Sequence, residues 1–190
     1  MGNMVKTNIM DYVFVTNDIG KEDCKFIIED LKNKEKLKHH WYDNISNKRY
    51  SNATAEPDVY FANEIHSQLL LPVINQAIEK YEKENVPKFA RKMISKVSNI
   101  RFNFYNKKTT MREHIDNIQS IFDGKEKGIP MLSIVGLLND DYKGGEFLMQ
   151  DKLIPLKAGD ILIFPSSFLY PHTVQHVKKG VRHSFVCWAY

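Results

Sequence analysis

The sequence predicts a mainly β fold of the sandwich or jelly-roll type, supported by helices in the N-terminal half. In the second half, short apolar runs separated by turn residues recur about every ten residues, a spacing typical of β-sandwiches and barrels. In the first half, apolar residues recur at three- and four-residue steps, which is the period of an amphipathic helix. With 190 residues, the chain fits one domain with its own core.

The chain begins with a predicted strand and helix. Residues 12–15 (YVFV) form a compact apolar run of the strand type. Asn17 or Asp18 is suited to cap the helix that follows, because a short polar side chain can accept a hydrogen bond from the first helical turn. The apolar spacing after this cap extends the predicted helix to about residue 34.

A polar segment and a longer helix come next. Residues 42–58 are rich in Asn and Ser, contain a proline and show no period, so we expect a long loop. Long ordered loops often cover a binding site. The apolar residues from Ile65 to Tyr81 recur at helical steps and predict an amphipathic helix, bent near Pro72.

The second half changes to the pattern of short strands. A turn with Gly144 and Gly145 interrupts it at residues 140–145. The sequence shows neither an internal repeat nor a low-complexity tract. The runs that we expect to be strands are 97–104, 131–138, 146–149, 161–164 and 185–188.

Composition narrows the class of partner. The net charge is +4, but Lys alternates with Glu and Asp, whereas nucleic-acid-binding domains usually carry a clustered basic stripe. A nucleic-acid partner is therefore not favoured. Cys24 and Cys187 lie among apolar neighbours and fit a reducing compartment. No apolar run approaches ~18 residues, so we expect no membrane partner. We expect a cytoplasmic location, in a bacterial or virus-infected cell, given the Lys and Asn richness.

One histidine–aspartate pair has the spacing of a metal site. His114 and Asp116 are two residues apart, so on a strand both side chains would project from the same face. A second histidine would complete a set of two histidines and one carboxylate, which suits Fe(II) and leaves positions open for other ligands. His172 and His176 share strand parity and both are candidates, whereas His183 should point away.

The chain from residue 96 to 190 resembles the prolyl 4-hydroxylase-like branch of the 2-oxoglutarate/Fe(II) dioxygenases. Several segments match in order and spacing, whereas residues 1–95 match only loosely. The matching segments are 101–105 (RFNFY), 113–116 (EHID), 144–146 (GGE), 158–166 (AGDILIFPS), 171–175 (PHTVQ), 177–184 (VKKGVRHS) and Trp188.

The resemblance implies a double-stranded β-helix, a cupin-like variant of the jelly roll, that covers 1–190 as one dioxygenase domain. Residues 96–190 would form the catalytic core, and residues 1–95 would supply helical support and substrate loops. The implied iron ligands are His114, Asp116 and His172, because the family places this histidine ten residues before a basic residue, here Arg182.

The resemblance also implies the co-substrate site. Arg182 would pair with the distal carboxylate of 2-oxoglutarate, since a guanidinium offers two parallel donors to a carboxylate. Tyr105 would add its hydroxyl, and Ser184 and Trp188 are weaker candidates for this site. The implied cofactors are Fe(II), 2-oxoglutarate and O2, with ascorbate as an optional addition.

The implied activity is hydroxylation of an unactivated C–H bond, with release of succinate and CO2. The family points to a peptidyl proline as substrate, although fold and cofactor do not fix the substrate. A nucleobase or a free amino acid is the enzymatic alternative. A jelly-roll module that binds metal without turnover is the alternative from another class. The sequence does not indicate the oligomeric state.

Overall fold

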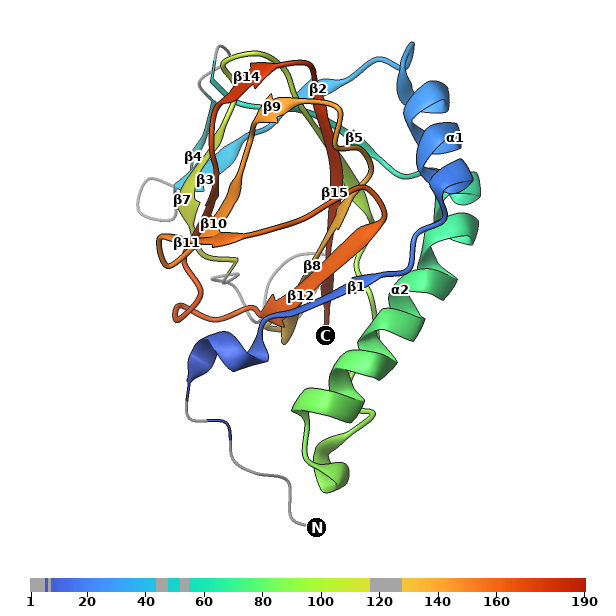
Figure 1. Ribbon diagram of the computed structural model, residues 1–190, viewed down its shortest axis with the longest axis vertical. Coiled ribbons are helices and arrows are strands. Elements are labelled where there is room, and N and C mark those ends of the chain that lie inside the picture. The colour runs from blue at the N-terminus through green and yellow to red at the C-terminus, as the bar shows by residue number, and fades with distance from the viewer. Residues whose placement is uncertain (1–5, 7, 44–47, 52–54, 117–127) are drawn as a thin grey trace.

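The computed structural model describes residues 6, 8–43, 48–51, 55–116 and 128–190. In these residues two antiparallel sheets enclose an apolar interior (Figure 1). The larger sheet has seven strands in the order β1 (Phe14–Asn17), β12 (Asp160–Pro165), β8 (Leu132–Leu137), β15 (Arg182–Ala189), β6 (Arg101–Tyr105), β5 (Asp58–Phe61) and β2 (Leu37–Lys38). The smaller sheet has the order β11 (Lys152–Ile154), β10 (Phe147–Met149), β13 (His172–Val174) and β7 (Met111–His114).

The central strands of the larger sheet are buried on both faces. In β12, Ile161 and Ile163 pack toward the helices, whereas Leu162 and Phe164 pack into the space between the two sheets. This alternation follows from the two-residue period of a strand. Because both faces are buried, the strand reads as a continuous apolar run in the sequence, as strands covered on both sides do.

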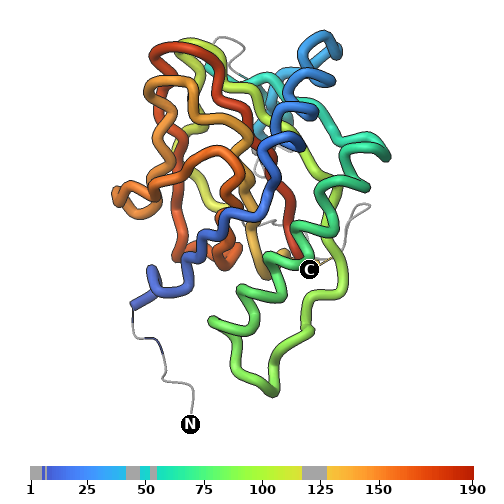
Figure 2. Tube along the Cα trace, turned by 45° about the vertical axis from the view of Figure 1, so that its right-hand side comes forward, coloured from blue at the N-terminus to red at the C-terminus, as the bar shows by residue number. Residues whose placement is uncertain are grey.

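The two long helices cover the outer face of the larger sheet. Helix α1 (Lys21–Leu31) buries Cys24, Ile27 and Leu31 against this face, and α2 (Glu64–Asn85) adds an apolar stripe to the same core. Both helices lie on one side of the barrel in Figure 1, and the turned view of Figure 2 agrees. The helices therefore leave the space between the two sheets free for a site.

Helix α2 begins at a well-formed cap. The Asn63 side chain accepts a hydrogen bond from the His66 backbone N–H, and the His66 ring accepts one from the Asn63 backbone. This reciprocal capping satisfies two donors that a helix start would otherwise leave free. Pro72 lies inside α2 without ending it, and the predicted helix is confirmed.

Most predicted strands are confirmed, with shifts at the first strand and first helix. The strand expected at 12–15 lies two residues later, because Ile9–Tyr12 form a 3-10 helix capped by the Asn8 side chain. The predicted N-cap at Asn17 or Asp18 is wrong: the cap is Gly20, and Asn17 bonds Asp160 instead. The helix ends at Leu31, before the predicted end.

The loop expected at 42–58 is wrong in part. Strands β3 (Trp41–Asp43) and β4 (Lys48–Tyr50) pair within it, and residues 44–47 and 52–54 lie outside the described residues. Strand β4 is exposed along its whole length, so the segment carries no apolar pattern. The short pair β9 (Lys143–Gly144) and β14 (Val177–Lys179) and the 3-10 helix Lys88–Ala90 complete the described elements.

The N-terminal half thus supplies more than helices, because β1, β2 and β5 are strands of the larger sheet. The centre of the larger sheet requires one glycine, because a Cβ on Gly136 would lie 2.0 Å from the Phe185 ring of the adjacent strand. Neither α1 nor α2, the helices of eight or more residues in the described part of the chain, has the length and apolarity to cross a bilayer.

Candidate metal centre

Two histidines face each other across the pairing of β7 with β13. His114 ends β7, His172 begins β13, and the two residues are direct partners in the antiparallel register. Each ring places Nδ1 against a backbone carbonyl, 2.8 Å from Arg112 O for His114 and 3.0 Å from Tyr170 O for His172. A carbonyl can only accept, so each Nδ1 carries the proton and each Nε2 keeps a lone pair for a metal.

Asp116 supplies the carboxylate. Its Oδ1 lies 3.6 Å from His114 Nε2, and its Oδ2 lies 3.7 Å from His172 Nε2. One ligand atom from each of the three residues fits within a 4.8 Å span. Asp116 Oδ2 is buried and has no hydrogen-bond partner among the described residues, as expected of an atom whose partner is a metal ion.

Asp116 is not on a strand, contrary to the expectation from its spacing to His114. His114 is the last residue of β7, and Asp116 lies beyond the strand end. The same-face rule for alternate strand residues therefore does not apply between them. The side chains converge because the chain leaves the strand after His114.

The protonation states suit a divalent metal. Burial, and then the neighbouring His172, lower the pKa of His114 to about 4. Burial alone would raise the pKa of Asp116, but the imidazoles of His172 and His114 outweigh it and hold that pKa below its usual range. At neutral pH, His114 is neutral and Asp116 is ionised, which are the forms that bind metal. A set of two imidazoles and one carboxylate fits Fe(II).

Arg182 lies in the same cavity with part of its hydrogen-bonding capacity unused. Its side chain is 1% exposed, and Nη1 donates to Ser184 Oγ at 2.7 Å. Nε and Nη2 are buried without a partner in the described part of the chain. Tyr105, its partner in the pairing of β15 with β6, lies with its ring 5.1 Å from the guanidinium carbon. Two adjacent free N–H donors match the two oxygens of a carboxylate.

A glycine makes room for this arginine. Gly145 has φ +67°, and a Cβ there would lie 3.1 Å from Arg182 Cδ and 3.0 Å from Val177 Cγ2. The sequence identified Gly144 and Gly145 as turn residues within a segment that resembles the dioxygenase family, and gave neither a contact with Arg182. Gly145 and Arg182 are 37 residues apart in the sequence, and this spacing does not predict their contact.

The cavity between these side chains is small. About 30 Å³ is free beside the metal-binding set, and a second cavity of about 280 Å³ lies next to it, with Arg182 on the wall of both. A five-carbon dicarboxylate would enter the first space only if the surrounding side chains shifted. Protein side chains therefore fill part of the space from which a ligand would reach the free N–H donors of Arg182.

Trp41 is a neighbour of the metal centre that the sequence did not identify. Its indole packs edge-on against the His114 ring, with centroids 5.1 Å apart. The indole Nε1 donates to Glu56 Oε1 at 2.6 Å, and the ring of His39 packs edge-on against the indole with centroids 4.7 Å apart. His39 had no expected role, yet it is buried in this cluster. The cluster fixes one face of His114.

The other predicted residues differ in their position relative to the metal-binding set. His176 is exposed, with Nδ1 against the Lys108 carbonyl at 2.9 Å, so it is outside the metal-binding set. Trp188 packs against the guanidinium of Arg101, and its side chain also lies beside Asp116, where it helps to lower the pKa of that carboxyl. Tyr105 is buried in the cavity wall, where burial raises its pKa.

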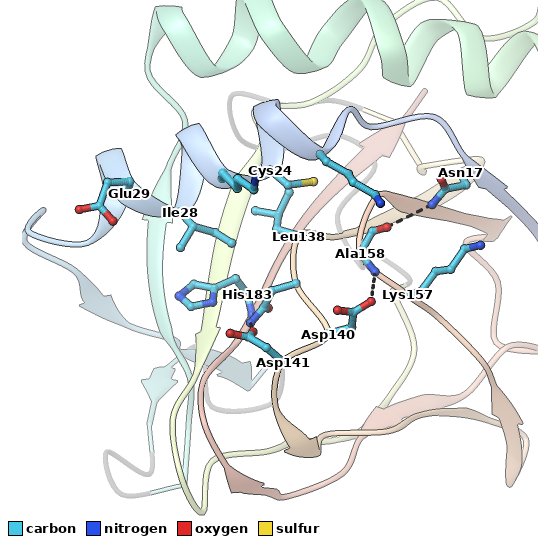
Figure 3. Close-up of a pocket in the computed structure, with 13 residues that line it drawn as sticks. Asn17, Cys24, Ile28, Glu29, Leu138, Asp140, Asp141, Lys157, Ala158 and His183 are labelled. Atoms are coloured by element: carbon cyan, nitrogen blue, oxygen red, sulfur yellow. Dashed lines mark hydrogen bonds between the residues drawn. The ribbon is translucent and has the colours of Figure 1, made fainter.

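His183 points to a different cavity. That space, about 790 Å³, lies between α1 and the loops that precede β9 and β12, and Figure 3 shows His183, Asp141 and Ile28 on its walls. It contains none of the three metal-binding residues. As predicted from strand alternation, His183 and Arg182 face opposite sides of β15.

Comparisons with known proteins agree with this geometry. Residues 100–190 match the 2OG-Fe(II) oxygenase superfamily. A PKHD-type hydroxylase from Rippkaea orientalis is 32% identical over 99 residues, which are 49% of this chain and 43% of the relative. One from Delftia acidovorans is 29% identical over 154 residues, or 73% and 65% of the two chains. The chain thus spans less than two thirds of the length of these relatives.

Solved structures share the fold at low sequence identity. A viral collagen prolyl hydroxylase from Paramecium bursaria Chlorella virus 1 superposes with a TM-score of 0.66 at 13% identity, covering 96% of this chain and 98% of that chain. A prolyl 4-hydroxylase from Pseudomonas putida gives 0.63 at 14% identity, covering 95% and 96%. The predicted fold class, a mainly β double-stranded β-helix with supporting helices, is confirmed. Residues 100–190 thus match the 2OG-Fe(II) oxygenase superfamily in sequence, and the chain has a fold like that of prolyl 4-hydroxylases.

Proposed function

We propose that this protein is a 2-oxoglutarate-dependent Fe(II) hydroxylase. His114, Asp116 and His172 would hold the iron, and Arg182 would hold the distal carboxylate of 2-oxoglutarate. The observation that carries the proposal is the pair of unpartnered donors on a buried arginine in the same cavity as a metal-binding set. A module that only bound metal would not need this arginine, which disfavours the non-catalytic alternative.

Bound iron would supply oxidation by O2: one oxygen atom of O2 would enter a substrate C–H bond, and the other would enter succinate as 2-oxoglutarate loses CO2. The chain's own residues position the reactants. The two Nδ1–H donors to backbone carbonyls fix the imidazole rings, so that both Nε2 lone pairs face Asp116. Ser184 accepts from Arg182 Nη1 and orients the guanidinium. We propose Tyr105 as a second contact for the distal carboxylate, because it lines the cavity beside this arginine.

We infer that residues 1–190 work as one catalytic unit. Strands β1, β2 and β5 come from the N-terminal half and complete the sheet that carries Arg182 and Tyr105. The β3–β4 pair brings Trp41 to the metal-binding set. The N-terminal half would therefore shape the site as well as support it.

For the substrate we propose a prolyl residue of a peptide or protein. Similar structures include a prolyl hydroxylase from Trichoplax adhaerens in complex with a peptide of hypoxia inducible factor, with a TM-score of 0.68 at 12% identity and coverage of 94% and 83%. A free amino acid or a nucleobase is the second candidate. Salt-dependent binding of single-stranded DNA or RNA would favour the nucleobase.

The experiment is turnover with Fe(II), 2-oxoglutarate and O2 on a panel of proline-containing peptides. We expect one added oxygen on a peptide by mass spectrometry, with an equal amount of succinate. An Asp116→Ala variant serves as the control for metal-dependent turnover. Succinate formation without modification of any peptide would keep the oxygenase and remove the peptide. Absence of succinate from folded, metal-loaded protein would refute the proposed function.

A further inference from the structure

A second arginine lies in the metal-binding cavity, away from Arg182. Arg101 begins β6, and its side chain lines the same cavity as His114, Asp116 and His172. Its guanidinium lies over the Trp188 ring, 5.6 Å from the centroid, and Nε donates to Asn103 Oδ1 at 3.1 Å. Trp188 and Asn103 thus hold the Arg101 side chain in place, and its two terminal nitrogens remain available to a ligand.

Strand alternation sets the place of Arg101. Residues 101, 103 and 105 of β6 all line the cavity, and in the register they pair with residues 186, 184 and 182 of β15. Tyr105 and Arg182 are thus at one end of this pair of strands and Arg101 at the other. Four residues along a strand span about 13 Å. The two arginines therefore face different parts of whatever the cavity binds.

Arg101 has no carboxylate partner among the residues that the structure describes. No ion pair within 4.0 Å involves it, and Nη1 and Nη2 form no hydrogen bond with a described residue. Burial lowers its pKa, opposed by the more distant Tyr105 and Asp116. Arg101 is half-buried, and a partly desolvated cation without a counter-ion favours an anionic ligand group.

The sum of the charges in the assembled site also favours an anionic ligand group. The two positive charges of ferrous iron match the two negative charges of 2-oxoglutarate. Among the residues that line the cavity, Arg101 and Arg182 carry two positive charges and Asp116 carries one negative charge. One positive charge is therefore left for the remaining ligand, which is the substrate.

We propose that Arg101 selects substrates that carry a free carboxylate next to the ring or chain that is oxidised. This proposal rests on the proposed function of the site. Within the prolyl class, it favours proline with a free carboxyl group, as the free acid or at a peptide C-terminus, over proline inside a peptide. Arg101 is then a specificity-determining residue, and the co-substrate keeps Arg182.

The test compares two probes that differ only in this charge: N-acetyl-L-proline and N-acetyl-L-prolinamide. Anaerobic protein with Fe(II) and 2-oxoglutarate is titrated with each probe, and tryptophan fluorescence reports binding, since Trp41 and Trp188, the only two tryptophans, lie at the site. We expect the wild type to bind the acid about tenfold or more tightly than the amide. Arg101→Gln should reduce this ratio to about one, and Arg101→Lys should retain part of it.

The matched control is Arg49→Gln, which removes the same charge from an exposed residue of β4 and should leave the ratio unchanged. Circular dichroism confirms that each variant is folded. Equal binding of acid and amide by the wild type, binding of neither, or an unchanged ratio in Arg101→Gln would overturn the proposal. So would a tenfold loss of 2-oxoglutarate affinity in Arg101→Gln, because Arg101 would then be a co-substrate anchor. A wild type that does not bind 2-oxoglutarate contradicts the proposed function itself, whatever the probes do.

Discussion

Replacing Arg182 by Met separates binding of the co-substrate from stability of the fold. Arg182 is 1% exposed, and its Nε and Nη2 have no partner in the described residues. In a purely structural arginine these donors would be bonded within the protein. If these donors instead bind a ligand carboxylate, they are unpaired in the ligand-free protein and do not stabilise it. Methionine fills a similar volume and carries no charge.

The expected magnitudes follow from these contacts. Two charge-assisted hydrogen bonds to a carboxylate contribute about 1.5–3 kcal/mol each, so their loss should weaken 2-oxoglutarate binding by roughly two to four powers of ten. Each buried donor without a partner costs about 1–3 kcal/mol, and Arg182→Met removes two of them. The bond from Nη1 to Ser184 is lost at the same time. The ligand-free variant should therefore be at least as stable as the wild type.

Two measurements check this prediction. Anaerobic isothermal titration calorimetry of the Fe(II)-loaded protein gives the 2-oxoglutarate affinity, and urea unfolding of the ligand-free protein gives its stability. Arg49→Met, the same change at an exposed position, should alter neither. The reasoning is refuted if Arg182→Met binds 2-oxoglutarate within about threefold of the wild type. It is also refuted if the variant loses more than about 2 kcal/mol of stability.

Three more predictions concern the surroundings. His172→Ala should abolish Fe(II) binding in equilibrium dialysis, while His176→Ala, at an exposed residue, should retain it; the reverse would identify the wrong ligand. Gly145→Ala should weaken 2-oxoglutarate binding about tenfold in calorimetry, because its Cβ would lie 3.1 Å from the anchoring arginine; unchanged affinity would contradict this. Burial raises the pKa of Cys24 to about 11 and also raises that of Cys187, so both thiols should resist Ellman's reagent at pH 8 until urea is added; rapid labelling of the folded protein would contradict the burial.

The sequence was informative where residues close in the chain are also close in the fold. His114 and Asp116 are two residues apart, and the ten-residue spacing of His172 to Arg182 belongs to one continuous stretch. The structure brings the first three together as a possible metal-binding set. Strands buried on both faces, such as β8 and β12, were also predictable, because burial on both sides demands an unbroken apolar run.

The rest of the site depends on pairings that one sequence does not encode locally. Arg101 reaches the cavity because β6 pairs with β15, and Trp41 reaches His114 from β3, which pairs with the exposed strand β4. Neither contact leaves a spacing signal. The N-cap was misplaced for a similar reason, since Asn17, a good capping residue, is engaged by Asp160, 143 residues away.

The central claim is that Fe(II) and 2-oxoglutarate bind together between the metal-binding set and Arg182. The most direct measurement is the visible absorption spectrum of the anaerobic protein as 2-oxoglutarate is added after Fe(II). We predict a charge-transfer band that grows to saturation at one equivalent of 2-oxoglutarate per chain. Folded protein that binds Fe(II) but gives no such band would contradict the claim.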